Sequence, residues 1–304
     1  AGRYHAHYQA LRARHEFIDL CKQPELAAEV TMGPIDDFGF DAAILFSDLL
    51  FPLEAMGMGL RYAPGPQLDW HVRGPADLAR LRTGPGALAQ LEFQAEAIRA
   101  LRPRLGWERA LIGFVGGPFT LYAYAAAGSH EGFTRQGPPG LEDGLYAGFC
   151  ERLVDLLADN MVLQARAGAD CVALFDTAAG ALDAAQFAQH AVAPLARVVA
   201  RFRESCPLTP LIYYSRDTGP DHWRALDGLD LQCLGVDWRH ELDATLVAQT
   251  PRWCLQGNLD PDWLLLPADE LERRVRAVFS RVCALPAAVS CRRCSLSASG
   301  SFAH

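Results

Sequence analysis

The sequence predicts an α/β fold, a (β/α)8 barrel of the TIM type, on three observations. Short apolar segments alternate with longer segments of helical periodicity, which is typical of a parallel sheet with right-handed crossovers. Polar residues follow the apolar segments directly, and a barrel gathers such positions in one mouth. No G-x-G-x-x-G sequence follows the first segment, which disfavours the alternative, a doubly wound nucleotide-binding sheet.

The elements follow one another in order along the chain. The predicted strands are short, apolar and bounded by polar or glycine positions; they are residues 42–47, 111–115, 171–175, 211–215, 232–236 and 253–257. The predicted helices are residues 24–38, 87–101, 141–167, 184–202 and 268–282. Six strands of eight are visible, so the barrel is expected to be incomplete at its first and last strands, at the two ends of the chain.

Composition and charge limit the class of protein. The 304 residues are 50% hydrophobic and 21% charged, as in ordinary soluble globular proteins. No apolar run approaches the roughly 18 residues that a membrane span needs. The net charge of −8 argues against a nucleic-acid partner, and an anionic small substrate would need local arginines.

The nine cysteines indicate a reducing compartment. They are odd in number and mostly scattered through apolar segments, as expected for buried thiols in a cytoplasmic protein. Cys291 and Cys294 have a zinc-like spacing, but a zinc site needs about four ligands and no second pair matches. Residues 283–304 are rich in Ser, Cys and Ala without strand or helix periodicity, so we divide the chain into a barrel at 1–282 and an aberrant or disordered tail.

Asp48 is the first candidate for chemistry. It follows a strongly apolar segment, where a carboxylate is costly unless it meets a cation or N–H donors. Asp is also a common cap for a following helical turn. Spacing alone leaves both interpretations open.

Residues 113–124 form a second candidate region. The paired glycines Gly116 and Gly117 allow a close backbone approach, and Pro118 can begin a helix. Thr120 and Tyr124 then lie on one helix face near an N-terminus whose N–H groups favour an anion. A tight strand-to-helix joint would explain the glycines equally well.

Several motifs resemble those of the uroporphyrinogen decarboxylase family. They are Ala-Gly-Arg-Tyr at 1–4, Phe-Ser-Asp-Leu-Leu at 46–50, Gly-Phe-x-Gly-x-Pro-x-Thr-Leu-x-x-Tyr at 113–124, Phe-Asp-Thr at 175–177 and Leu-Gln-Gly-Asn-Leu-Asp-Pro at 255–261. The resemblance covers residues 1 to about 282. It implies a cofactor-free, metal-free cytoplasmic homodimer that removes CO2 from the four acetate side chains of the tetrapyrrole uroporphyrinogen III to give coproporphyrinogen III in haem biosynthesis.

The resemblance also assigns roles to residues. Protonation of a pyrrole carbon creates a cationic ring that accepts the electrons left when CO2 departs, and Asp48 would stabilise that cation. Arg3 would anchor a substrate carboxylate as a charge-assisted pair. The other implied substrate contacts are Ala1 and Gly2, the hydrogen-bonding residues Tyr124 and Thr177, and the apolar walls Phe17, Ile44, Phe46 and Phe114.

The sequence departs from the family pattern in two places. The family's Asn-Leu-Gly-His-Gly motif is absent from residues 283–304, and a further family arginine would precede Ala1. Arg216 is either another carboxylate anchor or an exposed arginine.

Two alternative functions remain. One is a corrinoid-linked methyltransferase, although no His-x-Cys pair with a later Cys is seen at strand ends, and the other is an inactive truncated barrel.

Overall fold

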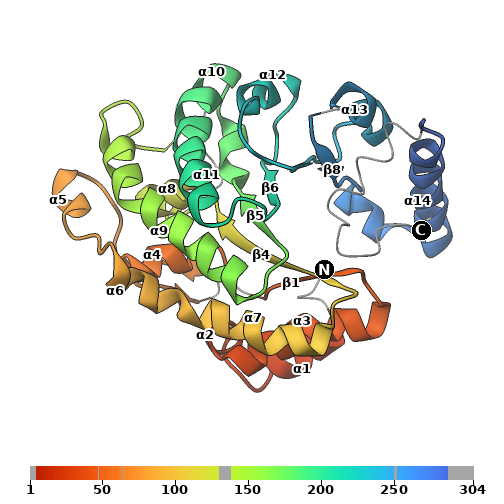
Figure 1. Cartoon of the computed structure of the whole chain (residues 1–304), viewed down its shortest axis with the longest axis horizontal. Coiled ribbons are helices and arrows are strands. Elements are labelled where there is room, and N and C mark those ends of the chain that lie inside the picture. The colour runs from red at the N-terminus through yellow and green to blue at the C-terminus, as the bar shows by residue number, and fades with distance from the viewer. Residues whose placement is uncertain (1–4, 47, 64, 130–137, 250–251, 287–304) are drawn as a thin grey trace.

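Six parallel strands form the main sheet of the computed structural model, which describes residues 5–46, 48–63, 65–129, 138–249 and 252–286 (Figure 1). Their order is β1-β4-β5-β6-β7-β8, the same as in the chain. They are β1 (Ala42–Ile44), β4 (Ala110–Gly116), β5 (Cys171–Phe175), β6 (Leu211–Tyr214), β7 (Cys233–Gly235) and β8 (Cys254–Gln256). All six predicted strands are present, and the sequential winding confirms the prediction of an incomplete TIM-type barrel.

The first strand is shorter than predicted. Leu45 still donates its N–H to the carbonyl of Ile112 on β4, at 3.0 Å. The next N–H, that of Phe46, turns away and donates to the Thr31 hydroxyl at 3.0 Å. A side chain on the preceding helix therefore ends the strand before residue 47.

The long helices agree closely with the periodicity. They are α3 (Pro24–Phe38), α7 (Glu92–Leu105), α9 (Leu145–Ala167), α11 (Ala193–Ser205) and α14 (Ala268–Cys283). Helix α7 begins later than residue 87 because α6 (Pro85–Leu88) and a 3₁₀ turn (Ala89–Leu91) come first, and α10 (Ala184–Gln186) and a π-helical turn (Phe187–Val192) precede α11. Helices α3, α7, α9 and α11 pack side by side around the outside of the sheet (Figure 1).

Shorter elements fill the connections, and most of them carry no clear sequence periodicity. The helices are α1 (Ala6–Arg12), α2 (Phe17–Lys22), α4 (Phe51–Ala55), α5 (Pro75–Leu78), α8 (Pro118–Ala127), α12 (Pro220–Trp223) and α13 (Leu242–Gln249). The 3₁₀ turns are η3 (Thr177–Ala181), η5 (Arg224–Leu226) and η6 (Pro261–Leu265), and a small hairpin joins β2 (Arg61–Tyr62) to β3 (Pro66–Gln67).

The two faces of the sheet bury different side chains. The outer face packs Val115, Val172 and Leu234 against the helices in the largest core cluster. The inner face forms a separate cluster of strand residues alone, with Ile112 and Cys233 among them. Because side chains alternate along a strand, the last inner-facing residue of each strand lies at the carboxyl edge of the sheet.

The cysteines are buried as predicted wherever the structure describes them, with one exception. Six are buried, namely Cys21, Cys150, Cys171, Cys206, Cys233 and Cys254, and Cys283 is exposed. Cys291 and Cys294 and nearly all of the predicted tail lie outside the described residues. In the described ranges, no helix has the length and apolar character that crossing a membrane requires.

Candidate active site at the carboxyl edge of the sheet

Gly116 and Gly117 bring three segments together at the end of β4. A Cβ on Gly116 would lie 3.3 Å from the carbonyl oxygen of Leu49, the residue after Asp48. A Cβ on Gly117 would lie 2.3 Å from Cγ of Asp176, which follows β5. A side chain at Gly117 would overlap Asp176, and one at Gly116 would press on Leu49 and Leu121, so the predicted close approach is present.

The N-terminus of α8 binds an anion that belongs to the protein. Pro118 begins the helix as predicted. The Thr120 backbone N–H and hydroxyl both donate to Asp176 Oδ1, each at 2.7 Å. We expected the N–H groups at this helix end to bind an anionic ligand. At Thr120 this expectation is wrong, because the residue is buried and its N–H already donates to the Asp176 carboxylate.

Asp176 is itself an unusual carboxylate. It is fully buried, and burial raises its pKa to about 6, although the hydrogen bonds from Thr120 act in the opposite direction. Oδ2 and the neighbouring Tyr213 hydroxyl are buried too, and neither has a hydrogen-bond partner of normal geometry in the described part of the chain. Burial, followed by the Asp176 charge, raises the pKa of Tyr213 well above its usual value.

Asp48 lies half-buried between β1 and α4. Its Oδ1 accepts the backbone N–H of Leu50 at 3.1 Å, immediately before α4 begins at Phe51. Asp48 therefore caps the turn that precedes α4, whereas the N-cap residue of the helix itself is Leu50, which has no side-chain cap bond. A carboxylate offers about four acceptor positions on two oxygens, so the cap is compatible with a role toward substrate.

An aromatic row crosses the inner face of the sheet near its carboxyl edge. Ile44, 49% exposed at the end of β1, belongs to the same face as Phe114 on β4. The Phe114 ring lies 5.7 Å from Phe175, and Phe175 lies 6.2 Å from Tyr214 on β6. Sequence reasoning missed Phe175 and Tyr214, although each is the last inner-facing residue of a predicted strand.

The two other predicted wall residues lie together in a second aromatic cluster. The rings of Phe17 and Phe46 are 5.8 Å apart. Tyr62 of the β2–β3 hairpin lies 4.4 Å from Phe17, and Tyr8 of α1 lies 5.7 Å from Phe46. Phe17 is buried in this cluster and Phe46 is half-buried, so Phe46 offers the larger surface to a ligand.

Tyr124 and Thr177 complete the described members of the predicted site. Tyr124 is half-buried one turn after Thr120 on α8. Thr177, also half-buried, is the first residue of η3 and directly follows Asp176. Ala1, Gly2 and Arg3 lie outside the described residues.

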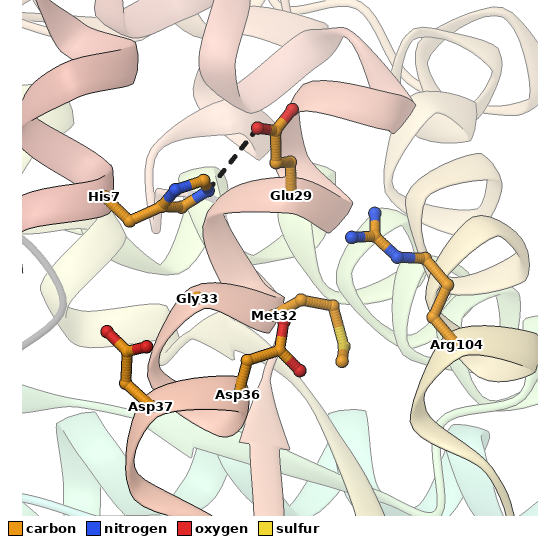
Figure 2. Close-up of a pocket in the computed structure, with 7 residues that line it drawn as sticks. All are labelled: His7, Glu29, Met32, Gly33, Asp36, Asp37 and Arg104. Carbon is orange, nitrogen blue, oxygen red and sulfur yellow. Dashed lines mark ion pairs between the residues drawn. The ribbon is translucent and has the colours of Figure 1, made fainter.

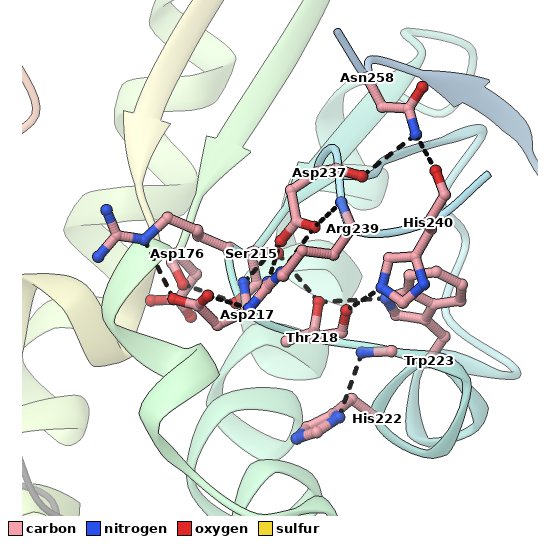
Figure 3. A network of polar contacts seen from close by, with 12 residues as sticks. Asp176, Ser215, Asp217, Thr218, His222, Trp223, Asp237, Arg239, His240 and Asn258 are labelled. Carbon is pink, nitrogen blue, oxygen red and sulfur yellow. Dashed lines mark hydrogen bonds and ion pairs between the residues drawn. The ribbon is translucent and has the colours of Figure 1, made fainter. Parts of the chain in front are cut away.

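A polar network joins the loops after β6 and β7 (Figure 3). The Asp237 side chain is only 1% exposed and forms an ion pair with the Arg239 guanidinium, which also pairs with Asp217. Burial would raise the pKa of Asp237, but hydrogen bonds from Arg239 outweigh it and hold that pKa below its usual value. Arg216 contacts Asp217 through Nε at 3.2 Å and keeps a side chain that is 39% exposed.

The same network extends to the loop after β8 (Figure 3). The Asn258 amide donates to the backbone carbonyls of Asp237, at 3.2 Å, and His240. His240 Nε2 lies 2.8 Å from the Thr218 carbonyl, and Trp223 donates to the Thr218 hydroxyl at 3.1 Å. The polar residues that follow β6, β7 and β8 thus form one hydrogen-bonded network at the carboxyl edge of the sheet. Arg239, Asp217 and His240 carried no motif that singled them out.

A cavity of about 360 Å³ lies elsewhere, among α1, α3 and α7 (Figure 2). Its lining residues are His7, Glu29, Met32, Gly33, Asp36, Asp37 and Arg104. The ends of α3 and α7 that line it lead into the amino ends of β1 and β4, opposite the carboxyl edge. Its acidic lining also suits an anionic substrate poorly, so we place the candidate site at the carboxyl edge.

Comparison with known proteins gives one family. A family model described as uroporphyrinogen decarboxylase (URO-D) matches residues 1–285. The uroporphyrinogen decarboxylase of Roseiflexus sp. (strain RS-1) is 38% identical over 293 residues, which cover 94% of this chain and 84% of the relative. That of Trichlorobacter lovleyi is 36% identical over 285 residues, covering 92% and 82%.

Solved structures share the fold. A methyltransferase from Methanosarcina mazei superposes with a TM-score of 0.70 at 18% identity, covering 90% of this chain and 84% of that one. A putative vitamin-B12 independent methionine synthase from Listeria monocytogenes gives 0.53 at 12% identity, covering 92% and 83%. At such identities the similarity concerns the fold alone.

Fold and site together define an enzyme of the TIM-barrel class, with its polar residues at the carboxyl edge of a sequentially wound parallel sheet. Within that class, the family model and the similar sequences identify the protein family. The chain belongs to the uroporphyrinogen decarboxylase family.

Proposed function

We propose that this chain removes CO2 from the four acetate side chains of uroporphyrinogen III and yields coproporphyrinogen III in haem biosynthesis. The observation that carries the proposal is the family match over residues 1–285, which includes the strand-end motifs around Asp48, Tyr124 and Thr177. We further propose that it acts as a cytoplasmic homodimer without cofactor.

The proposed mechanism uses electrostatic stabilisation of a cation. A proton added to a pyrrole carbon makes the ring cationic, and the electrons of the breaking C–C bond then flow into the ring as CO2 leaves. A second proton converts the remaining methylene to methyl, and the ring gives back the first. Each cycle therefore consumes one proton and releases one CO2. Asp48 stabilises the cationic ring, as a half-buried carboxylate does more strongly than one in bulk water.

The other site residues orient the substrate. Tyr124 and Thr177 donate hydrogen bonds to substrate carboxylates, and Arg3 pairs with a further carboxylate. The apolar row of Ile44 and Phe114, extended by Phe175, faces the pyrrole rings. Phe17 and Phe46 contribute a second apolar wall.

The test is an anaerobic assay with uroporphyrinogen III prepared by chemical reduction. Products are oxidised and separated as porphyrins with eight to four carboxyl groups. Stepwise appearance of the seven- to four-carboxyl species supports the proposal. No loss of CO2 by folded protein, with the substrate verified intact, contradicts it and favours the inactive-barrel alternative.

A chelation experiment separates the decarboxylase from the methyltransferase alternative. A methyltransferase of that kind needs clustered His and Cys side chains for a thiol-activating zinc, and no such metal-holding group occurs among the residues that the structure describes. We expect decarboxylation to survive exhaustive chelation. Loss of turnover that zinc restores would favour the alternative and direct attention to Cys291 and Cys294.

A further inference from the structure

Asp176 is a buried carboxylate without a cationic partner among the described residues, which is unfavourable for the stability of the fold. Its carboxyl group is fully buried, and it forms no ion pair with any Lys, Arg or His of the described ranges. A buried charge without a cation is costly unless hydrogen bonds compensate it. Here Oδ1 accepts two hydrogen bonds from Thr120, whereas Oδ2 has no partner of normal geometry in the described part of the chain. A cost of this kind suggests a role other than stability.

Asp176 and Thr120 together fasten three elements. The Thr120 N–H and hydroxyl donate to Asp176 Oδ1, and the Thr120 hydroxyl accepts the N–H of Ala178 at 3.0 Å. The Ser215 hydroxyl, after β6, donates to the Asp176 carbonyl at 2.9 Å. Helix α8, turn η3 and the end of β6 therefore meet at the Asp176–Thr120 pair, which we call the junction.

Tyr124 and Thr177, the two proposed hydrogen-bond donors to the substrate, lie next to this junction in α8 and η3. Tyr124 is one helical turn beyond Thr120, on the same face of α8. Thr177 lies between Asp176 and Ala178, the two residues that Thr120 contacts. The hydrogen bonds of Thr120 to Asp176 and Ala178 therefore hold in place the backbone segments that carry Tyr124 and Thr177.

We propose that Asp176 is a positioning residue of the decarboxylation, which in its ionised form holds Thr120 and thereby sets the places of Tyr124 and Thr177. This inference rests on the proposed function. The ionised form matters because hydrogen bonds to a charged acceptor are stronger and shorter than those to a neutral one. Asp176 does not touch the substrate; it acts through α8 and η3.

The positioning role of Asp176 predicts that turnover depends on pH. The titratable groups that act on Asp176 are Tyr213 from β6 and Tyr146 and Cys150 from α9; burial raises the pKa of each, so all three stay neutral near pH 7. Asp176 is then the group of the junction that changes charge near pH 6. Acidification neutralises it, weakens its hold on Thr120 and lowers turnover.

The decisive variant is Asp176→Asn, which keeps the shape and one acceptor oxygen but removes the charge and the titration. We expect kcat at pH 7.5 to fall by about tenfold, the difference between a charged and a neutral hydrogen-bond acceptor. The acid limb near pH 6 should disappear, and the wild-type and variant profiles should converge below about pH 5. An unchanged kcat with an unchanged acid limb would overturn the inference, while decarboxylation itself would stand.

Thr120 supplies an independent test. Thr120→Val removes the bridging hydroxyl and should lower kcat by a similar factor, with Thr120→Ser restoring it. Thr245→Val is the matched control, because Thr245 on α13 is also buried and bonded, to the Glu241 carbonyl, but lies outside the junction. Full activity of Thr120→Val, or an equal loss in the control, would contradict a positioning role. Thermal melts verify that each variant is folded before the kinetics are compared.

Discussion

Gln164 on α9 bonds both backbone groups of Phe114 on β4. Its Oε1 accepts the Phe114 N–H at 2.8 Å, and its Nε2 donates to the Phe114 carbonyl at 3.0 Å. In the described part of the chain, β1 pairs with β4 as far as Leu45. The N–H and the carbonyl of Phe114 come next on that edge of β4, and Gln164 bonds both of them. The absent side chain of Gly113 leaves the room, since a Cβ there would lie 2.4 Å from Oε1. A buried glutamine thus continues the sheet where a strand stops.

Replacing this glutamine should destabilise the fold. Gln164→Leu leaves a buried N–H and a buried carbonyl unpaired, at about 1–3 kcal/mol each. We expect a total loss of about 2–6 kcal/mol in the free energy of unfolding, measured in urea. Gln67→Leu is the control, because the Gln67 side chain is exposed and donates to the Ala63 carbonyl on the surface. It should change stability by less than about 0.5 kcal/mol. Equal effects of the two substitutions would contradict the structural role of Gln164.

Asp48→Asn should lower kcat far more than it weakens substrate binding. The amide retains an oxygen that caps Leu50 but loses the charge that stabilises a cationic ring. Steady-state kinetics and substrate titration measure the two effects separately. Asp183→Asn serves as control, since the exposed Asp183 also accepts the backbone N–H two residues further on, that of Ala185 at 3.0 Å. Near-normal turnover of Asp48→Asn would remove Asp48 from the mechanism.

Tyr124→Phe should be milder. The proposed role is one hydrogen bond to a substrate carboxylate, worth about 0.5–1.5 kcal/mol net, or roughly twofold to tenfold in kcat/KM. The ring is half-buried against the core, and phenylalanine preserves that packing. A loss as large as that of Asp48→Asn would assign Tyr124 a direct part in proton transfer instead.

Asp176 should make the protein less stable at neutral pH than a neutral side chain would. Burial raises its pKa to about 6, so the protonated form is favoured in the folded state. The stability from this group is present in full below its unfolded pKa, about 4, and is lost as the pH rises through 6. Asp176→Asn should therefore gain about 3 kcal/mol over wild type at pH 7.5 and almost nothing at pH 4.

Urea unfolding of both proteins at the two pH values checks this expectation. A constant difference at both would show that Asp176 does not titrate in this range. Greater stability of the variant with lower kcat would show that the buried charge serves activity rather than stability.

The repeating strands and helices could be predicted because their signals are local. Strands β4 to β8 are apolar runs closed by polar residues, and α3 was predicted with both of its ends. Helix α3 starts with a proline in its first turn and stops at Gly39, which adopts φ 64°. The aromatic partners of Phe114, by contrast, depend on the register of neighbouring strands, which periodicity does not specify.

By itself, the sequence determined the barrel class, the position of each motif after a strand, and the family to which those motifs belong. Only the tertiary structure decided which polar groups satisfy one another. Thr120 meets Asp176 across 56 residues and Phe114 meets Gln164 across 50, so no local pattern reveals either pair. Buried polar groups must find partners wherever the fold brings them, and that requirement acts in space rather than along the chain.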